Sequence, residues 1–189
     1  MQTAALSMSF KAAKKRLGLE NIRTTEAVIM NDPYHGGQHL NDIILFTPIF
    51  LDDQLLGWAG STAHHLDIGG GTAGVNTQAT ELIQEGLVLP PILFDIERDW
   101  NGGPLETLLA ANIRIPDIGI GDMNAQFAAN YTGAERILDL ARRYGVDGLW
   151  QAMAEVQDYS ERRMRASIEA IPDGVYRGEA FIDEDVFDP

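Results

Sequence analysis

The stretch from Asn31 to Gly71 reads NDPYHGGQHLNDIILFTPIFLDDQLLGWAGSTAHHLDIGGG and holds all four histidines of the 189-residue chain. A short pattern, His-x-x-Asp, occurs in it twice, as His39 with Asp42 and as His64 with Asp67. Imidazole and carboxylate groups together are typical ligands of a divalent transition metal. The stretch therefore predicts a metal site.

Two apolar runs within this stretch predict a β-hairpin. The runs are Ile43–Phe50 (IILFTPIF) and Leu55–Thr62 (LLGWAGST), and residues 51–54 between them supply the turn. Antiparallel pairing places the start of the first strand beside the end of the second. We therefore expect Asp42 to lie next to His64, so that the hairpin closes the two halves of the metal site.

The rest of the sequence predicts an α+β fold with a mixed sheet, in which the hairpin carries the metal site and the C-terminal third is helical. Further strands are expected at residues 27–30 and 175–182. The segment Leu87–Ile96 is extended and interrupted by two prolines, which suits an edge strand or a buried linker. We expect helices over residues 1–19, from Pro104 to Asn112, from Asp122 to Tyr144 with a division at Thr132-Gly133, and from a cap at Asp147 to Ala170.

Composition excludes several classes of function. The formal net charge of −14 disfavours nucleic acid, because little in the chain would offset phosphate repulsion, and it equally disfavours an anionic membrane surface. The absence of cysteine removes thiolate ligands, catalytic thiols and disulfides. The sequence shows neither a signal-peptide pattern nor an apolar run long enough to span a membrane. We therefore expect a cytoplasmic protein.

The histidine-rich stretch allows simpler interpretations as well. The four histidines could be hydrogen-bonded loop residues with separate structural roles, and Asp32 before Pro33 could be only a turn-forming residue. If a metal binds, a His/Asp set without sulfur suits Mn, Fe, Zn or Ni better than Mg or Ca. Arg114 could bind a substrate carboxylate through its guanidinium.

Two weaker patterns remain open. The glycines at 69–71 could cradle a phosphate through backbone amides, although a flexible turn is the simpler interpretation because neither a Walker lysine nor GxGxxG is present. Glu81 and Glu85 could include a general base, but solvated helix glutamates are far more common.

Several segments in order resemble the hydantoinase B/oxoprolinase family. This family includes B-type subunits of ATP-dependent N-methylhydantoinases, the C-terminal part of 5-oxoprolinase and alpha subunits of acetone and acetophenone carboxylases. The matching segments are NDPYHGGQHLNDI (31–43), TPIF (47–50), AHHLDIGG (63–70), QEGLVLPP (84–91), NIRIP (112–116), GDMNAQFAAN (121–130) and IPDGVY (171–176).

The resemblance implies an enzyme subunit that opens a small cyclic amide such as a hydantoin or 5-oxoproline. It implies a hetero-oligomer with a hydantoinase A-type partner, and that partner would use the ATP. The metal ligands carried over are His39, Asp42 and His64, with manganese favoured from the carboxylase branch and zinc or iron as alternatives. Asp32, His65 and Asp67 are the residues then expected to act in catalysis or on the substrate side.

Two other functions remain open under the same resemblance. One is an ATP- and manganese-dependent carboxylase of acetone-type ketones, and the other is a truncated remnant without turnover. Family members are much longer than this chain, and its acidic end at residues 183–189 resembles a cut. We therefore expect residues 1–189 to form a single partial domain, an internal fragment of a longer chain that is inactive alone.

Overall fold

The computed structural model describes residues 2–180, with side chains from Ala5 onward. The chain divides into two compact units, residues 1–143 and residues 144–189. The first unit holds the whole sheet and every residue expected at the site, and the second holds one long helix.

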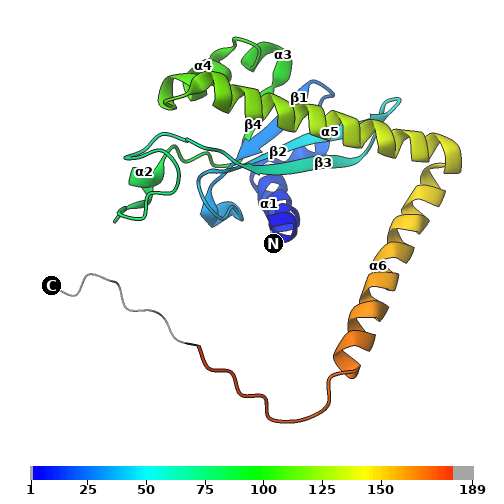
Figure 1. Ribbon diagram of the computed structural model, residues 1–189. Helices are drawn as coiled ribbons and strands as arrows, with labels where there is room; N and C mark the ends of the chain where they lie inside the picture. The colour runs from blue at the N-terminus through cyan, green and yellow to red at the C-terminus, as the bar shows by residue number, and fades with distance from the viewer. Residues whose placement is uncertain (1, 181–189) are drawn as a thin grey trace. The chain divides into compact units, whose positions relative to one another are not determined.

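A four-stranded sheet forms the centre of the first unit (Figure 1). Its order is β3-β2-β1-β4, and each neighbouring pair is antiparallel. The predicted α+β class is confirmed, but the strands are antiparallel throughout rather than mixed. Parallel neighbours need a long crossover connection, and no helix of that kind links β1, β2 and β3. The strands are β1 (Glu26–Met30), β2 (Asp42–Leu51), β3 (Gln54–His64) and β4 (Ile92–Asp95).

The predicted hairpin is confirmed as β2 and β3. Its register pairs Asp42 with His64 at the open end and Leu51 with Gln54 at the turn. Asp52, in that turn, has a φ of 52°, a left-handed conformation that Asp tolerates better than most residues. The strand predicted at residues 27–30 is β1, and the extended proline-containing segment supplies the short edge strand β4.

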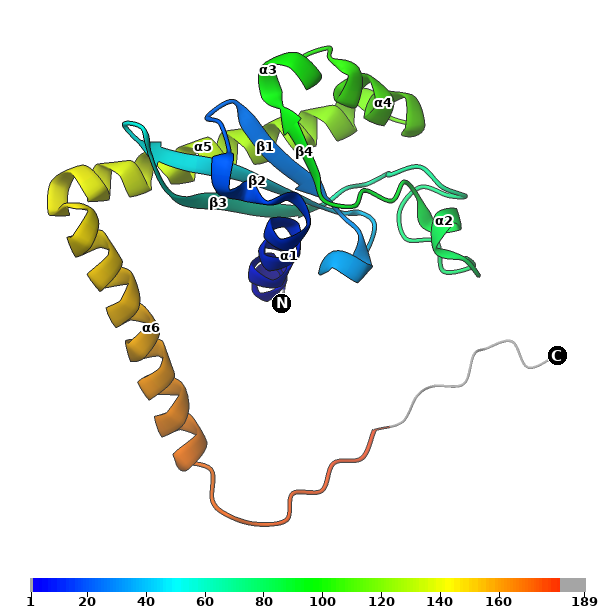
Figure 2. The same ribbon diagram turned by 180° about the vertical axis from the view of Figure 1, so that it is seen from behind.

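The two faces of the sheet carry separate cores because side chains alternate along each strand. One face packs against α4 (Pro104–Asn112) and α5 (Pro116–Tyr144), and the other packs against α1 (Gln2–Leu17). Figure 2 shows α5 and α1 on opposite sides of the strands. The face toward α5 contributes Ala27, Ile29, Ile43 and Leu45, and the face toward α1 contributes Val28, Met30, Ile44 and Phe46.

The long helices differ from expectation in detail. Helix α5 begins at Pro116 rather than at residue 122, and it runs through Thr132 and Gly133 without a division. The Thr132 hydroxyl donates to the Ala128 carbonyl at 2.8 Å, one turn back, so this residue does not interrupt the helix. Helix α6 (Val146–Glu169) has Gly145 at its N-cap. The predicted cap at Asp147 is wrong, because this side chain lies inside the first turn, where its charge still suits the helix dipole.

The remaining elements are short. They are α2 (Leu82–Glu85), α3 (Ile96–Asp99) and two 3₁₀ turns, η1 (Leu19–Asn21) and η2 (Pro33–His35). The strand predicted at 175–182 is wrong over residues 175–180, which are irregular and exposed with no strand to pair with, and 181–182 lie outside the described residues. Among the described helices, none is both long and apolar enough to cross a membrane.

Candidate metal centre

Asp42 is the centre of the candidate site. Its Oδ1 lies 2.7 Å from the His64 Nδ1 atom, and its Oδ2 lies 3.1 Å from the His39 Nδ1 atom. The backbone N–H of His39 also donates to Oδ2, at 3.2 Å. One potential ligand atom from each of the three side chains lies within 4.8 Å of the other two. The structure thus brings together the three residues predicted as metal ligands.

Local backbone geometry explains this convergence. The Asp42 N–H donates to the His39 carbonyl at 3.0 Å, which closes a tight turn and places residues three apart side by side. His64 is the last residue of β3 and stands opposite Asp42 in the hairpin. The site therefore follows from one turn and one strand pairing, both at the open end of the hairpin.

The surroundings of the three side chains suit a ligand that arrives from solvent. The Asp42 side chain is 3% exposed, whereas those of His39 and His64 are 57% and 42% exposed. One potential ligand atom from each side chain lies within 4.8 Å of the other two, which is close enough for all three to bind one ion. The nitrogen and oxygen donors also fit a divalent transition metal. The Nδ1–carboxylate distances of 2.7 and 3.1 Å are those of hydrogen bonds from imidazole N–H groups. Measured metal content therefore distinguishes a metal site from a purely hydrogen-bonded cluster.

His65 lies on the other face of the sheet from His64. Its side chain is buried, and its Nε2 atom lies 2.9 Å from the Gln126 Oε1 atom on α5. The amide of Gln126 is oriented by its own donation to the Ile43 carbonyl at 3.0 Å. His65 therefore donates through Nε2, which leaves Nδ1 as a buried acceptor without a hydrogen-bond partner.

Asp67 is buried and paired with Arg114. It accepts hydrogen bonds from the backbone N–H of Arg114, from the Gly69 N–H at 3.1 Å and from the Arg114 guanidinium at 2.7 Å. Burial alone would raise the pKa of Asp67, but the hydrogen bonds from Arg114 and Gly69 outweigh it and hold the pKa below its ordinary value. Asp67 thus fixes the loop that follows the site.

Arg114, which could bind a substrate carboxylate on the basis of its sequence position, is instead engaged by groups of the chain itself. Its guanidinium also donates to the carbonyls of Gly69 and Gly70, at 3.3 and 2.7 Å. The glycine loop is held rather than flexible, since the Gly71 N–H donates to the Gln84 carbonyl at 2.8 Å. Because the Gly69 and Gly71 N–H groups already donate to Asp67 and Gln84, they are not free to bind a phosphate.

Asp32 takes the turn-forming role that was the simpler interpretation of its position. It caps η2 by accepting from the Tyr34 N–H at 2.9 Å, and its other oxygen lies 2.7 Å from the His35 Nδ1 atom. Neither Asp32 nor His35 belongs to the three-residue cluster. Glu81 is exposed beside α2, as expected of a solvated glutamate.

Buried amides around the site were missed by the sequence reasoning. Asn31 is fully buried and ties three segments together, because it donates to the carbonyls of Leu40 and Leu87 and accepts from the Leu89 N–H. Gln126 was missed as well. A signal existed for it, because a polar residue beside Phe127 on the apolar stripe of a helix needs a buried partner.

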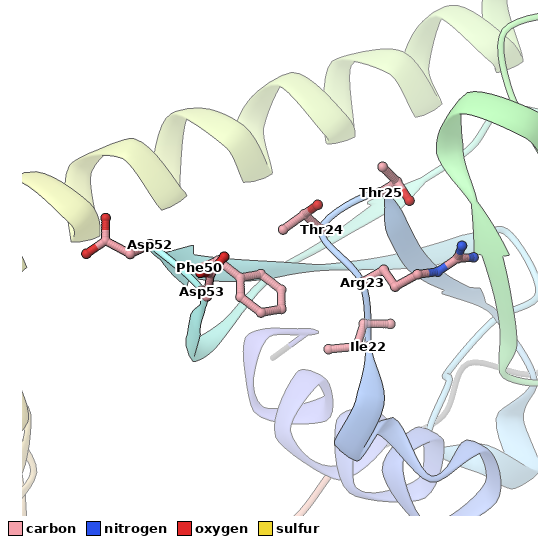
Figure 3. A pocket seen from close by; sticks show the side chains of 7 residues that line it. All are labelled: Ile22, Arg23, Thr24, Thr25, Phe50, Asp52 and Asp53. Atoms are coloured by element: carbon pink, nitrogen blue, oxygen red, sulfur yellow. The ribbon is translucent and has the colours of Figure 1, made fainter.

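A separate hollow of about 470 Å³ lies at the turn end of the hairpin, opposite the histidines (Figure 3). Its one basic side chain, Arg23, extends away from Asp52 and toward β4. The guanidinium is already paired with Glu26 at 2.7 Å and Asp95 at 3.3 Å. We assign no site to this hollow.

Comparison with known proteins gives the family. A sequence profile described as Hydantoinase B/oxoprolinase matches residues 1–188. The caprolactamase subunit beta of Pseudomonas jessenii is 34% identical over 170 residues, which are 87% of this chain and 28% of that protein. The crystal structure of the ATP-dependent caprolactamase from the same organism superposes with a TM-score of 0.81 at 32% identity, over 95% of this chain and 31% of that one.

A more distant structure shares the fold. The nucleotide-free structure of an acetone carboxylase superposes with a TM-score of 0.66 at 18% identity, over 77% of this chain and 20% of that one. The chain thus spans less than a third of the length of these relatives. With a profile match over nearly every residue, the chain belongs to the hydantoinase B/oxoprolinase family.

Proposed function

We propose that this chain forms the metal-binding part of a subunit of an ATP-dependent cyclic amide hydrolase. The single observation that carries the proposal is the convergence of His39, Asp42 and His64 on one solvent-open point, in a chain of this family. Hydantoins, 5-oxoproline and lactams are the cyclic amides in question. The relative named caprolactamase subunit beta supports action within a hetero-oligomer, with a hydantoinase A-type subunit as the ATP-using partner.

The three side chains would hold a divalent metal, with manganese favoured and zinc or iron as alternatives. A bound divalent ion supplies Lewis acidity that polarises a carbonyl oxygen. The buried Asp42 fixes the direction of both imidazoles through its two oxygens, so the rings are oriented before any ligand arrives. This preorganisation is the contribution that the chain itself makes.

We propose supporting roles, inferred from their contacts, for the three residues expected in catalysis. His65 holds the end of β3 to α5 through Gln126, and Asp67 fixes the glycine loop through Arg114. Asp32 orients His35 at the mouth of the preceding loop. We propose that these residues set the shape around the metal centre.

The test is phosphate release by the chain together with an ATP-using hydantoinase A-type subunit. The proposal expects ATP hydrolysis to depend on an added cyclic amide and to be lost in His64→Ala. Dependence on bicarbonate and a ketone instead would identify a carboxylase. No turnover with any of these substrates, in a complex that binds its metal, would identify a remnant without activity.

A further inference from the structure

A groove of about 430 Å³ lies between β3 and α5, and His64 is the one candidate metal ligand among the residues that line it. Its volume is in the range of small-molecule sites and exceeds that of a five- to seven-membered ring. Small side chains line much of it, so the walls are formed close to the backbone. The lining residues are Ser61, Thr62, Ala63, His64, His65, Asp122, Ala125, Gln126 and Ala129.

Two acceptors in the groove lack partners. The Asp122 carboxylate makes no hydrogen bond or ion pair with any described residue, and the buried His65 Nδ1 atom is likewise without a partner. Buried polar atoms are nearly always hydrogen-bonded, so the unpartnered His65 Nδ1 atom indicates a missing donor, whereas the Asp122 carboxylate is exposed and open to solvent. A ring N–H group is such a donor.

The charge of the groove also limits its ligand. Asp122 is the only acidic residue among the lining residues, and none of them is Lys or Arg. The nearby Arg114 is held by Asp67 and by the glycine-loop carbonyls. A ligand carboxylate in this groove would meet like charge without a compensating cation.

We propose that this groove is the substrate pocket and that it selects uncharged cyclic amides over ring acids. This inference rests on the proposed function and narrows it. The lactam ring lies against Ala125 and Ala129, and its N–H group donates to an acceptor in the groove. Hydantoin-like and lactam-like rings fit this pocket, whereas 5-oxoproline is disfavoured by its carboxylate.

Two probes that differ by one carboxylate test the proposal directly. They are 2-pyrrolidinone and 5-oxoproline, added to the purified chain and followed by protein NMR shifts. We expect 2-pyrrolidinone to bind about tenfold more tightly at low salt, a ratio that corresponds to about 1.4 kcal/mol. Equal binding, tighter binding of 5-oxoproline, or no binding of either probe would overturn the proposal.

Charge removal at Asp122 sharpens the test. Asp122→Asn should strengthen binding of 5-oxoproline and bring the ratio of the two affinities to about threefold or less. The control is Asp139→Asn, which removes an exposed α5 carboxylate paired with Arg142 and should leave the ratio unchanged. An unchanged ratio in Asp122→Asn would contradict the assigned role of this carboxylate.

Filling the groove tests its location. Ala129→Leu should weaken 2-pyrrolidinone binding at least about tenfold, because the larger side chain occupies the space of the ring. Ala128→Leu is the matched control, since this neighbouring exposed alanine does not line the groove. Equal binding by the two variants would place the ligand elsewhere and overturn the proposal.

Metal analysis of the same samples distinguishes a failure of the proposed function from a failure of the proposed pocket. If the chain holds a stoichiometric metal but Ala129→Leu binds 2-pyrrolidinone as tightly as the wild type, the proposed function stands and the proposed pocket is wrong. If the chain holds no metal, the proposed function is contradicted, while the affinities of the two probes still test whether the groove binds the ring.

Discussion

His64 and His65 are neighbours in sequence but belong to two different regions of the molecule. The His64 side chain is 42% exposed and contacts the buried Asp42, whereas His65 is 1% exposed and contacts Gln126 on α5. Successive residues of a strand point to opposite faces, so one imidazole enters the candidate metal centre and the other enters the helix interface. Residue type alone therefore does not assign a function in this stretch; the face of the sheet does.

The two regions should respond to mutation in opposite ways. On the His64 face, a change should alter metal binding with little effect on folding. On the His65 face, a change should alter stability and leave the metal in place. Each of the following variants tests one side of that contrast.

The largest expected effect is on metal affinity in Asp42→Asn. This carboxylate contacts both imidazoles, and its loss should weaken Mn²⁺ binding by at least about a hundredfold. Isothermal titration measures the affinity, and Asp32→Asn serves as the control because this residue also contacts a histidine but lies outside the cluster. Equal losses in both variants would contradict the assignment.

The next effect is on the free energy of unfolding in His65→Ala. The variant leaves a cavity and strands the Gln126 amide, which should cost about 2–3 kcal/mol. Urea unfolding followed by tryptophan fluorescence reports on it, because Trp100 is buried in the same core. His64→Ala should cost less than about 0.5 kcal/mol, and a larger loss in His64→Ala than in His65→Ala would break the comparison.

A smaller effect is on acid stability in Asp67→Asn. The folded-state pKa of Asp67 lies below its ordinary value of 3.8. The contribution of Asp67 to the free energy of unfolding is therefore complete above about pH 3.8. It is lost as the pH falls through the lower folded-state pKa. The variant should lose about 1–2 kcal/mol at pH 7 and show a flatter acid limb in unfolding measured from pH 5 to 2. An unchanged acid limb would remove the proposed role of this pair.

The smallest effect is a gain in stability from Gly133→Ala. Gly133 is exposed inside α5, and an added Cβ atom meets nothing within 4 Å. Alanine should therefore stabilise the helix by about 0.5–1 kcal/mol without any change in metal content. A loss of stability would show that the helix is interrupted at this point after all.

The hairpin and the proximity of Asp42 to His64 could be predicted from local sequence patterns, whereas the choice of His39, Asp42 and His64 as metal ligands came from the family resemblance. Two apolar runs and a short turn set the register, and the register alone puts Asp42 beside His64. The surroundings of His65 could not be predicted in this way. They depend on how α5 packs across the sheet, which places Gln126 beside His65. The pairing of Asp67 with Arg114 joins residues 47 apart in the chain, and no periodicity reports a contact of that kind.

Helix ends show the same limit. Asp147 has the side chain of a good N-cap, yet Gly145 takes the cap position and places Asp147 within the first turn. The alternation at residues 175–180 lacks a neighbouring strand, so the pattern alone does not produce a strand there. Local propensity states what a segment can form, and the partner across the fold decides whether it does.

The most direct test of the central claim is the metal content of the purified chain and of two histidine variants. The comparison is between His39→Ala and His35→Ala, since each histidine contacts an aspartate three residues away but only His39 belongs to the cluster. Elemental analysis after dialysis against Mn²⁺ should find about one ion per chain in the wild type and in His35→Ala, and almost none in His39→Ala. A wild-type chain without metal, or a His39→Ala chain that keeps it, would contradict the account.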